Sequence, residues 1–219
     1  MALDLYCERL GPGLLAEPIN AFTNAAFLVA AWWILARSRS PDGNRDWALV
    51  SLAVLALAIG IGSTLFHTVA SSWALLADVL PILLFQLLFL AVYLRRRTSW
   101  SQAAVVVVVA GFLLATLASR QWPTLLNGSL AYAPTLMVLL VLGWHDRRPL
   151  GSGALWPAAG LFALSLGFRS LDLQVCSWMP LGTHPLWHVL NGVVLALASQ
   201  ALLPRERSGD GGSHTGHGA

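Results

Sequence analysis

The sequence predicts an all-α fold, a polytopic membrane protein that consists of one bundle of seven transmembrane helices. Of the 219 residues, 57% are hydrophobic and 11% are charged, and the mean hydropathy is +0.68. An average soluble domain has about 25% charged residues, so this composition excludes an ordinary soluble fold. The apolar residues also form long continuous runs, and in lipid such runs satisfy their backbone hydrogen bonds only as helices.

Seven apolar segments follow one another, separated by short stretches that carry charges or turn-forming residues. The separators include "RSRSPDGNRD", "RRRTS" and "HDRRPLGSG". We expect residues 1–203 to form a single membrane domain. We expect residues 204–219, which are polar and Gly-rich, to form a disordered tail. The predicted helices span residues 20–36, 47–69, 73–94, 101–118, 129–144, 154–169 and 185–203.

Prolines and charges support the starts of two segments. Pro18 precedes the first segment, and Pro185 falls in the first turn of the seventh. Proline fits a first turn because the N–H that it lacks would have no partner within the helix. Glu17, directly before Pro18, complements the positive end of the helix dipole. The N-terminal stretch "MALDLYCERLGPG" lacks a basic region followed by an apolar core, so we expect no cleavable signal peptide.

The arginines predict how the bundle is oriented. The chain has thirteen Arg and no Lys. Ten Arg lie in the loops after the first, third and fifth segments and in the C-terminal tail, and three lie on the opposite side. Cytoplasmic loops carry such an excess, so we expect the N-terminus outside and the C-terminus in the cytoplasm. No basic stripe with interleaved aromatic residues indicates a nucleic-acid partner.

Polar residues of three predicted helices converge at the outer end of the bundle. Ser63 and His67 lie near the outer end of the second helix, and Asp78 lies near the outer start of the third. The first turns of the seventh helix contain His184 and His188. Both pairs have i,i+4 spacing, which places each pair on one helix face. Ionisable residues at membrane depth indicate a functional site by default.

Three His from two helices, with a water as the fourth ligand, form the ligand set of an open, catalytic zinc site. In that interpretation Asp78 holds or deprotonates the water, and Ser63 donates to a developing oxyanion. The alternative is structural. Intramembrane His and Ser side chains often hydrogen-bond a neighbouring helix, and Asp78 also suits the start of a helix.

The combined pattern resembles the alkaline ceramidases, a family of seven-helix integral membrane zinc amidases in a wider superfamily with the adiponectin receptors. The pattern is Ser-x-x-x-His, an Asp eleven residues later, and His-x-x-x-His at the start of the last helix. "YCER" followed by "AEPINAFTNAAF" resembles the opening of bacterial members, and the resemblance extends from Tyr6 to Asn191. It implies zinc ligands His67, His184 and His188, with Ser63 and Asp78 beside the metal.

The resemblance implies an activity and a location. The implied reaction is hydrolysis of the N-acyl bond of ceramide, a membrane lipid, to a sphingoid base and a fatty acid. The active site is expected toward the extracytoplasmic face, with a bacterial inner membrane as the location. No protein partner is evident in the sequence.

The resemblance extends only partly to a calcium site near the N-terminus. Family members bind calcium through an Asp-Trp-x-Glu-x-Asn run and a later Glu. Glu8 and Glu17 match the two Glu positions, whereas Leu5 and Leu10 occupy the Asp and Asn positions. Calcium prefers several oxygen ligands, so Glu8 and Glu17 are candidate ligands of an incomplete site. For Glu17 the helix start remains the other interpretation.

The two cysteines, Cys7 and Cys176, both fall on the outer side of the predicted topology. A disulfide can persist outside the cytoplasm, and here it would tie the N-terminal segment to the loop before the last helix. Two free thiols are the alternative. At the outer end of the sixth helix, Arg169 and Asp172 either pair with each other or shape the mouth of a cavity.

Seven-helix membrane proteins also have other functions. A retinal protein needs a Lys for its Schiff base, and the absence of Lys excludes that class. A haem or quinol protein could use paired His on different helices, but it would not need Ser63 and Asp78 beside them. A receptor-like protein with a structural zinc, and a hydrolase of another acyl amide or ester lipid, remain as alternatives.

Overall fold

The computed structural model describes residues 3–39, 42–146 and 153–203, so the predicted tail at 204–219 lies outside the described residues. Within these ranges the regular structure is helical, apart from an isolated bridge between Arg39 and Arg45. The all-α prediction is therefore confirmed. The helices are α1 (Pro18–Thr23), α2 (Ala25–Ala36), α3 (Trp47–Val69), α4 (Ser72–Arg97), α5 (Gln102–Ser119), η1 (Leu125–Tyr132), α6 (Ala133–Asp146), α7 (Leu155–Val175) and α8 (His184–Gln200).

Within the described parts of the chain, five helical stretches are long and apolar enough to cross a membrane, which supports the membrane class. α7 and α8 do not belong to them; α8 has only 17 residues, and α7 carries two charged residues near its end. The seven-span count and the orientation therefore stay predictions. The five stretches are Pro18–Ala36, Trp47–Val69, Ser72–Arg97, Gln102–Ser119 and Leu125–Asp146.

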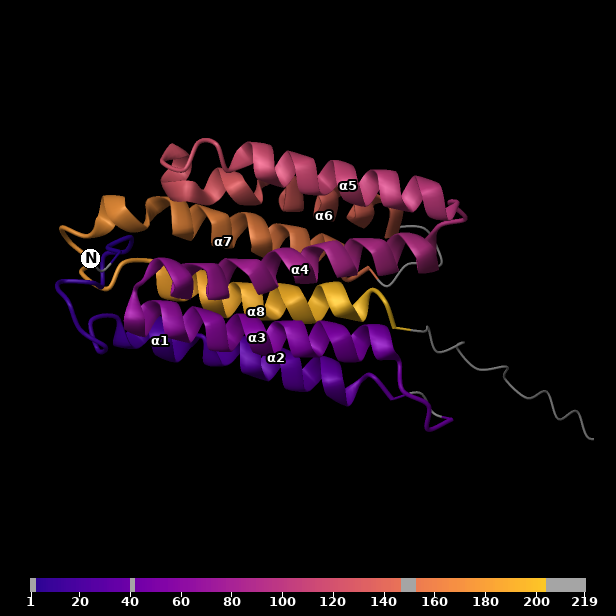
Figure 1. Ribbon diagram of the computed structural model, residues 1–219, viewed down its shortest axis with the longest axis horizontal. Helices are drawn as coiled ribbons and strands as arrows, with labels where there is room; N and C mark the ends of the chain where they lie inside the picture. The colour runs from indigo at the N-terminus through magenta and orange to yellow at the C-terminus, as the bar shows by residue number, and fades with distance from the viewer. Residues whose placement is uncertain (1–2, 40–41, 147–152, 204–219) are drawn as a thin grey trace, which may run out of the picture.

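The helices lie side by side along the long axis of the molecule, with α5 and α6 on one side and α1, α2 and α3 on the other (Figure 1). α3 packs on α2 and α4, and α8 packs on α2 and α7. The start of α8 thus lies near the N-terminal segment, although the two are far apart in the sequence (Figure 1). This arrangement places α1 and the start of α8 at the same end of the bundle.

The first predicted helix is divided in two at Asn24. The Thr23 hydroxyl donates to the carbonyl of Ile19, and the Asn24 side-chain amide donates to the carbonyl of Asn20. Side chains that bond back to the preceding turn compete with the helical ladder and bend helices. The break separates α1 from α2 and turns the Thr23 side chain toward α8, where its hydroxyl meets His188.

A tight hairpin joins α3 to α4. Ala70, directly after α3, has a left-handed backbone with φ of 49°, and the Ser71 hydroxyl caps α4 by accepting from the backbone N–H of Ala74. Gly62 of α3 lets the backbones of α3 and α4 approach closely, because a Cβ there would lie 2.0 Å from the carbonyl oxygen of Ala77. The close approach sets the last turns of α3 against the first turns of α4.

The opposite end of this hairpin is held by an ion pair. Asp46 caps α3 by accepting from the backbone N–H groups of Ala48 and Leu49. Arg96, in the last turn of α4, donates to both oxygens of the same carboxylate at 2.7 and 2.8 Å. These bonds hold the pKa of the Asp46 carboxyl below its usual range. The pair joins the start of α3 to the end of α4.

Candidate metal centre

Three histidine rings meet at one end of the bundle. His67 comes from the last turn of α3, and His184 and His188 come from the first turns of α8. All three are buried, and each offers a ring nitrogen within 4.8 Å of those of the other two. The Nε2 atoms of His67 and His188 are 3.2 Å apart. Among the described residues, these three histidines form the group of His, Cys, Asp or Glu side chains that lie close enough together to hold a metal ion.

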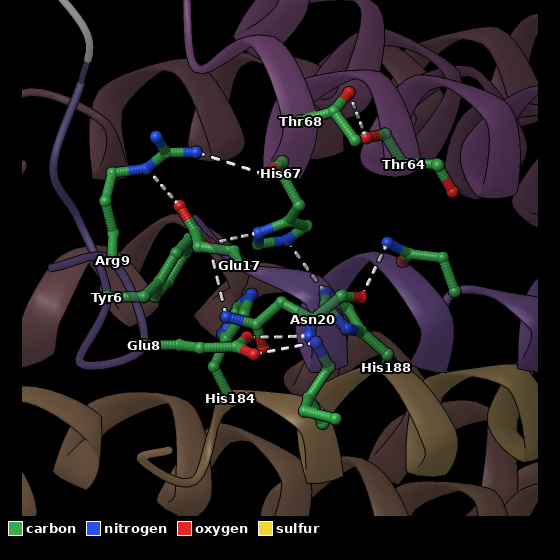
Figure 2. Close-up of polar contacts among 12 residues, drawn as sticks. Tyr6, Glu8, Arg9, Glu17, Asn20, Thr64, His67, Thr68, His184 and His188 are labelled. Atoms are coloured by element: carbon green, nitrogen blue, oxygen red, sulfur yellow. Dashed lines mark hydrogen bonds and ion pairs between the residues drawn. The ribbon is translucent and has the colours of Figure 1, made fainter. Parts of the chain in front are cut away.

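Neighbouring side chains orient two of these rings. The Nδ1 of His67 bonds to the carboxylate of Glu17 (Figure 2). The Nδ1 of His188 lies 2.9 Å from the hydroxyl of Thr23. A metal-binding histidine usually has a partner of this kind on its second nitrogen, which fixes the tautomer and the ring orientation. Both rings therefore turn Nε2 toward the centre of the cluster.

The donor set fits a metal ion. The Nδ1 of His184 is buried and has no hydrogen-bond partner among the described residues. A buried polar atom without a partner is costly, and such an atom calls for an explanation such as an ion. Three imidazoles in one buried group, with one nitrogen unpaired, match the three-histidine ligand set of a catalytic zinc site.

Ser63 and Asp78 lie beside the cluster, where the sequence predicts them. Ser63 is buried one turn before His67 on α3. The Asp78 carboxyl lies within interaction range of the Ser63 hydroxyl, His67 and Arg169. The structure thus brings together the five predicted residues of the zinc site, from α3, α4 and α8.

Glu8 and Glu17, the candidate calcium ligands, are engaged in protein contacts. The Glu8 carboxylate accepts from the backbone N–H groups of Ile19 and Asn20, at 2.6 and 2.8 Å, and so satisfies the start of α1. The Glu17 carboxylate bonds to Arg9, His67 and the side chain of Asn20 (Figure 2). These contacts do not test calcium binding, which stays a prediction.

Arg9 supplies a buried positive charge at this end of the bundle. Its guanidinium pairs with Glu17 and donates to the backbone carbonyl of His67 at 3.1 Å (Figure 2). Both side chains of the pair are almost completely buried. A buried carboxylate needs such a partner, and no spacing pattern in the sequence indicates this contact.

Tyr6 and Arg169 also lie against the histidine cluster, and sequence spacing did not predict their contacts there. The Tyr6 ring stacks on His184 with a centroid distance of 3.6 Å. Burial raises the pKa of the Tyr6 phenol to about 12, against the effect of the Arg169 guanidinium, so the phenol is neutral at pH 7. Its oxygen accepts from Arg169 at 2.7 Å. The guanidinium also lies 5.5 Å from the ring centroid of Trp187.

The loop before α8 is held by the disulfide and by Asp172. Cys7 and Cys176 form a disulfide, as predicted, and it links the N-terminal segment to the end of α7. Instead of pairing with Arg169, Asp172 accepts from the backbone N–H groups of Cys7 at 3.0 Å and His184 at 2.8 Å. One carboxylate therefore holds both the N-terminal segment and the start of α8.

An apolar cavity lies next to the cluster, deeper in the bundle. Apolar side chains make up most of its lining, and they include five phenylalanines contributed by α2, α4, α5 and α7. The cavity also reaches residues that lie one helical turn from Ser63, Asp78 and His188 on their own helices. These residues are Ile59, Ile82 and Asn191.

Residues 11–204 match the sequence profile of the family described as Ceramidase. The chain belongs to the ceramidase family. The predicted resemblance is therefore confirmed over most of the chain. No curated protein sequence matches the chain significantly. Membership of the ceramidase family implies a hydrolase that acts on a lipid, and the buried histidines of this ceramidase-family protein are compatible with metal-dependent hydrolysis.

Proposed function

We propose that the protein is a zinc-dependent amidase that hydrolyses the N-acyl bond of ceramide to a sphingoid base and a fatty acid. The observation that carries the proposal is the buried group of His67, His184 and His188 beside an apolar cavity, in a chain of the ceramidase family. A lipid amide has a polar reacting bond and long apolar chains, and the site offers a place for each.

The three histidines would hold the ion. When bound, zinc polarises an acyl carbonyl and lowers the pKa of water toward about 7. The residues around it hold the rings and the reactants. Glu17 and Thr23 fix two of the imidazoles through their Nδ1 atoms. The ring of the third, His184, is covered by Tyr6.

Asp78 and Ser63 would carry out the proton transfer and stabilise the charge. Asp78 accepts a proton from the attacking water, whose oxygen forms a bond with the carbonyl carbon. The Ser63 hydroxyl donates to the oxyanion that develops on the carbonyl. The carbon–nitrogen bond then breaks, and the nitrogen takes the proton from Asp78 to leave as an amine. Ser63 and Asp78 lie within interaction range of each other, so both groups are beside the histidines before the substrate binds.

The proposal includes the location of the chemistry. The arginine distribution favours an active site toward the extracytoplasmic face of the membrane. The resemblance to bacterial family members implies that this is a bacterial inner membrane. The disulfide at the same end supports this side, because disulfides persist outside the cytoplasm. A lipid amide lies near the headgroup boundary of a bilayer, which is the depth that helix ends provide.

The test measures zinc and turnover in the same detergent-purified samples. We expect about one zinc per chain and fatty acid release from a short-chain fluorescent ceramide for the wild type. His188→Ala is expected to lose both. His145→Ala is the matched control, because this histidine lies at the other end of the bundle, against Tyr93.

Each alternative has its own outcome in this experiment. Zinc without turnover of ceramide, but with turnover of another N-acyl or ester lipid, would replace the substrate in the proposal. Zinc without turnover of any acyl lipid would favour the receptor-like function. A His188→Ala variant that retains full zinc would contradict the ligand assignment.

A further inference from the structure

The apolar cavity contains polar side chains that its apolar lining does not satisfy. Gln86 lines it from α4, and Thr135 lines it from α6. Asn191 lines it from α8, but its side-chain amide donates to the hydroxyl of Ser165 at 2.8 Å and to the carbonyl of Trp187 at 2.7 Å. Gln86 and Thr135 are therefore the polar groups that remain to be explained.

Gln86 is a polar residue in an apolar part of α4. It follows Phe85 and lies between apolar positions of a helix that is otherwise hydrophobic from Val79 to Leu94. No hydrogen bond joins its side chain to any other described residue. Gln86 is only partly buried, and an amide that faces an apolar lining without a hydrogen-bond partner is unfavourable. Gln86 also lies eight residues after Asp78, or about 12 Å along the helix axis.

Thr135 differs from most of the helical threonines in this chain. The hydroxyls of Thr23, Thr64 and Thr68 bond to the carbonyl four residues earlier in the helix. The Thr135 hydroxyl is buried and has no hydrogen-bond partner among the described residues. Thr116 on α5 is likewise unpaired, but it does not line the cavity. Thr116 therefore provides a matched control.

The two groups line the same cavity from two different helices. α4 packs on α3 and α5, whereas α6 packs on α5 and α7. Side chains on a helix lean toward its N-terminus. Gln86 therefore leans toward the histidine end, and Thr135, three residues after Tyr132, lies close to that end on α6.

We propose that the cavity binds a hydrocarbon chain that carries a hydroxyl group near its middle, and that Gln86 and Thr135 hydrogen-bond this hydroxyl. The inference rests on the proposed function and narrows its substrate to lipids with a mid-chain hydroxylated acyl group. A plain hydrocarbon chain would leave both groups without a partner. A site built to bond a hydroxyl discriminates strongly against the analogue that lacks it.

The experiment compares two substrates that differ in one hydroxyl. They are a ceramide with a stearoyl chain and one with a stearoyl chain hydroxylated at the twelfth carbon. We expect the wild type to prefer the hydroxylated substrate by about tenfold in kcat/KM. Gln86→Met and Thr135→Val are expected to bring this ratio close to one. Thr135→Ser and the control Thr116→Val are expected to keep it.

A second measurement does not depend on catalysis. The free hydroxylated fatty acid is expected to raise the thermal midpoint of the wild type more than stearic acid does, and this difference is expected to vanish in Gln86→Met. If no ceramide is turned over but the difference in midpoint is present, the proposed function fails and the hydroxyl site stands.

Two outcomes would overturn the inference. One is a wild type that treats both substrates and both fatty acids equally, because bound water would then satisfy Gln86 and Thr135. The other is a preference that survives in both Gln86→Met and Thr135→Val, because the hydroxyl would then be bound elsewhere.

Discussion

At the scale of single residues, the histidine cluster depends on partners from helices that contribute no histidine. Glu17, just before α1, holds His67 of α3, and Thr23 of α1 holds His188 of α8. Glu17 is in turn paired with Arg9. Removal of one member of a buried ion pair costs about 3 to 5 kcal/mol, because the other charge remains buried. Thr23 is therefore the partner that can be changed with least risk to the fold.

Thr23→Val tests this arrangement. The variant removes the hydroxyl that bonds to Nδ1 of His188, so that the ring loses its orienting partner. We expect zinc affinity to fall by about tenfold or more, as for other orienting residues of zinc sites. The measurement is zinc retention in competition with a chelator. Thr98→Val is the control, because its hydroxyl bonds to the carbonyl of Leu94 at the other end of the bundle. Equal retention in both variants would contradict the assigned role.

The sequence was sufficient to predict that Ser63, His67, Asp78, His184 and His188 lie at the same end of the bundle, because helical spacing and predicted depth are local properties. The other members of the site could not be found in this way. Thr23 and His188 are 165 residues apart, and so are Cys7 and Asp172. No periodicity relates such positions, and only the packing of α1 on α8 brings Thr23 to the ring.

At the scale of helices, the approach of α3 to α4 positions the Ser63–Asp78 pair. Gly62 precedes Ser63, and its missing Cβ lets the carbonyl of Ala77, just before Asp78, come into contact. The sequence predicted both helices well, with α3 at the same bounds and α4 extended by one residue at its start and three at its end. It did not predict the contact, because a glycine within a helix has several possible causes.

Gly62→Ala is expected to force the two helices apart. A methyl group 2.0 Å from the Ala77 carbonyl requires a backbone shift, with a cost of about 1 to 3 kcal/mol. Turnover should fall by about tenfold or more, since small displacements of reacting groups have large effects. Thermal unfolding in detergent and kcat measure the two effects.

The control for this variant is Gly111→Ala in α5, where a Cβ meets nothing within 4 Å. It is expected to stabilise the protein by about 0.5 to 1 kcal/mol, because alanine loses less conformational freedom in a helix than glycine does. A Gly62→Ala protein as stable and as active as Gly111→Ala would show that the approach of the two backbones is not needed.

At the scale of the whole molecule, the bundle has two chemically different ends. The histidines, the disulfide and the N-terminal segment lie at one end, and the Asp46–Arg96 pair lies at the other. The predicted sixth helix, 154–169, proved too short: α7 extends to Val175 and includes Arg169 and Asp172. Hydropathy ended that prediction at a charge, whereas tertiary bonds to Tyr6 and to the α8 backbone let the helix continue.

The orientation of the two ends is tested with single cysteines. The native cysteines are joined in the disulfide, so an introduced thiol is the reactive one among the described residues. We expect a membrane-impermeant maleimide to label Thr124→Cys, before η1, in intact cells. Ser99→Cys, after α4, is expected to react only after the membrane is opened. The reverse pattern would invert the predicted topology.

Because the histidine cluster combines residues of an early helix and of the last helix, it can form only late in the synthesis of the chain. A ribosome has made α3, and with it His67, long before α8 supplies His184 and His188. Cys176, the disulfide partner of Cys7, is synthesised 169 residues after it. A growing chain that ends before α7 and α8 contains His67 but neither of the other two histidines. It also lacks Cys176, which ties the N-terminal segment to the loop before α8. The nascent protein is therefore unable to assemble its three-histidine cluster until the final helix has been made.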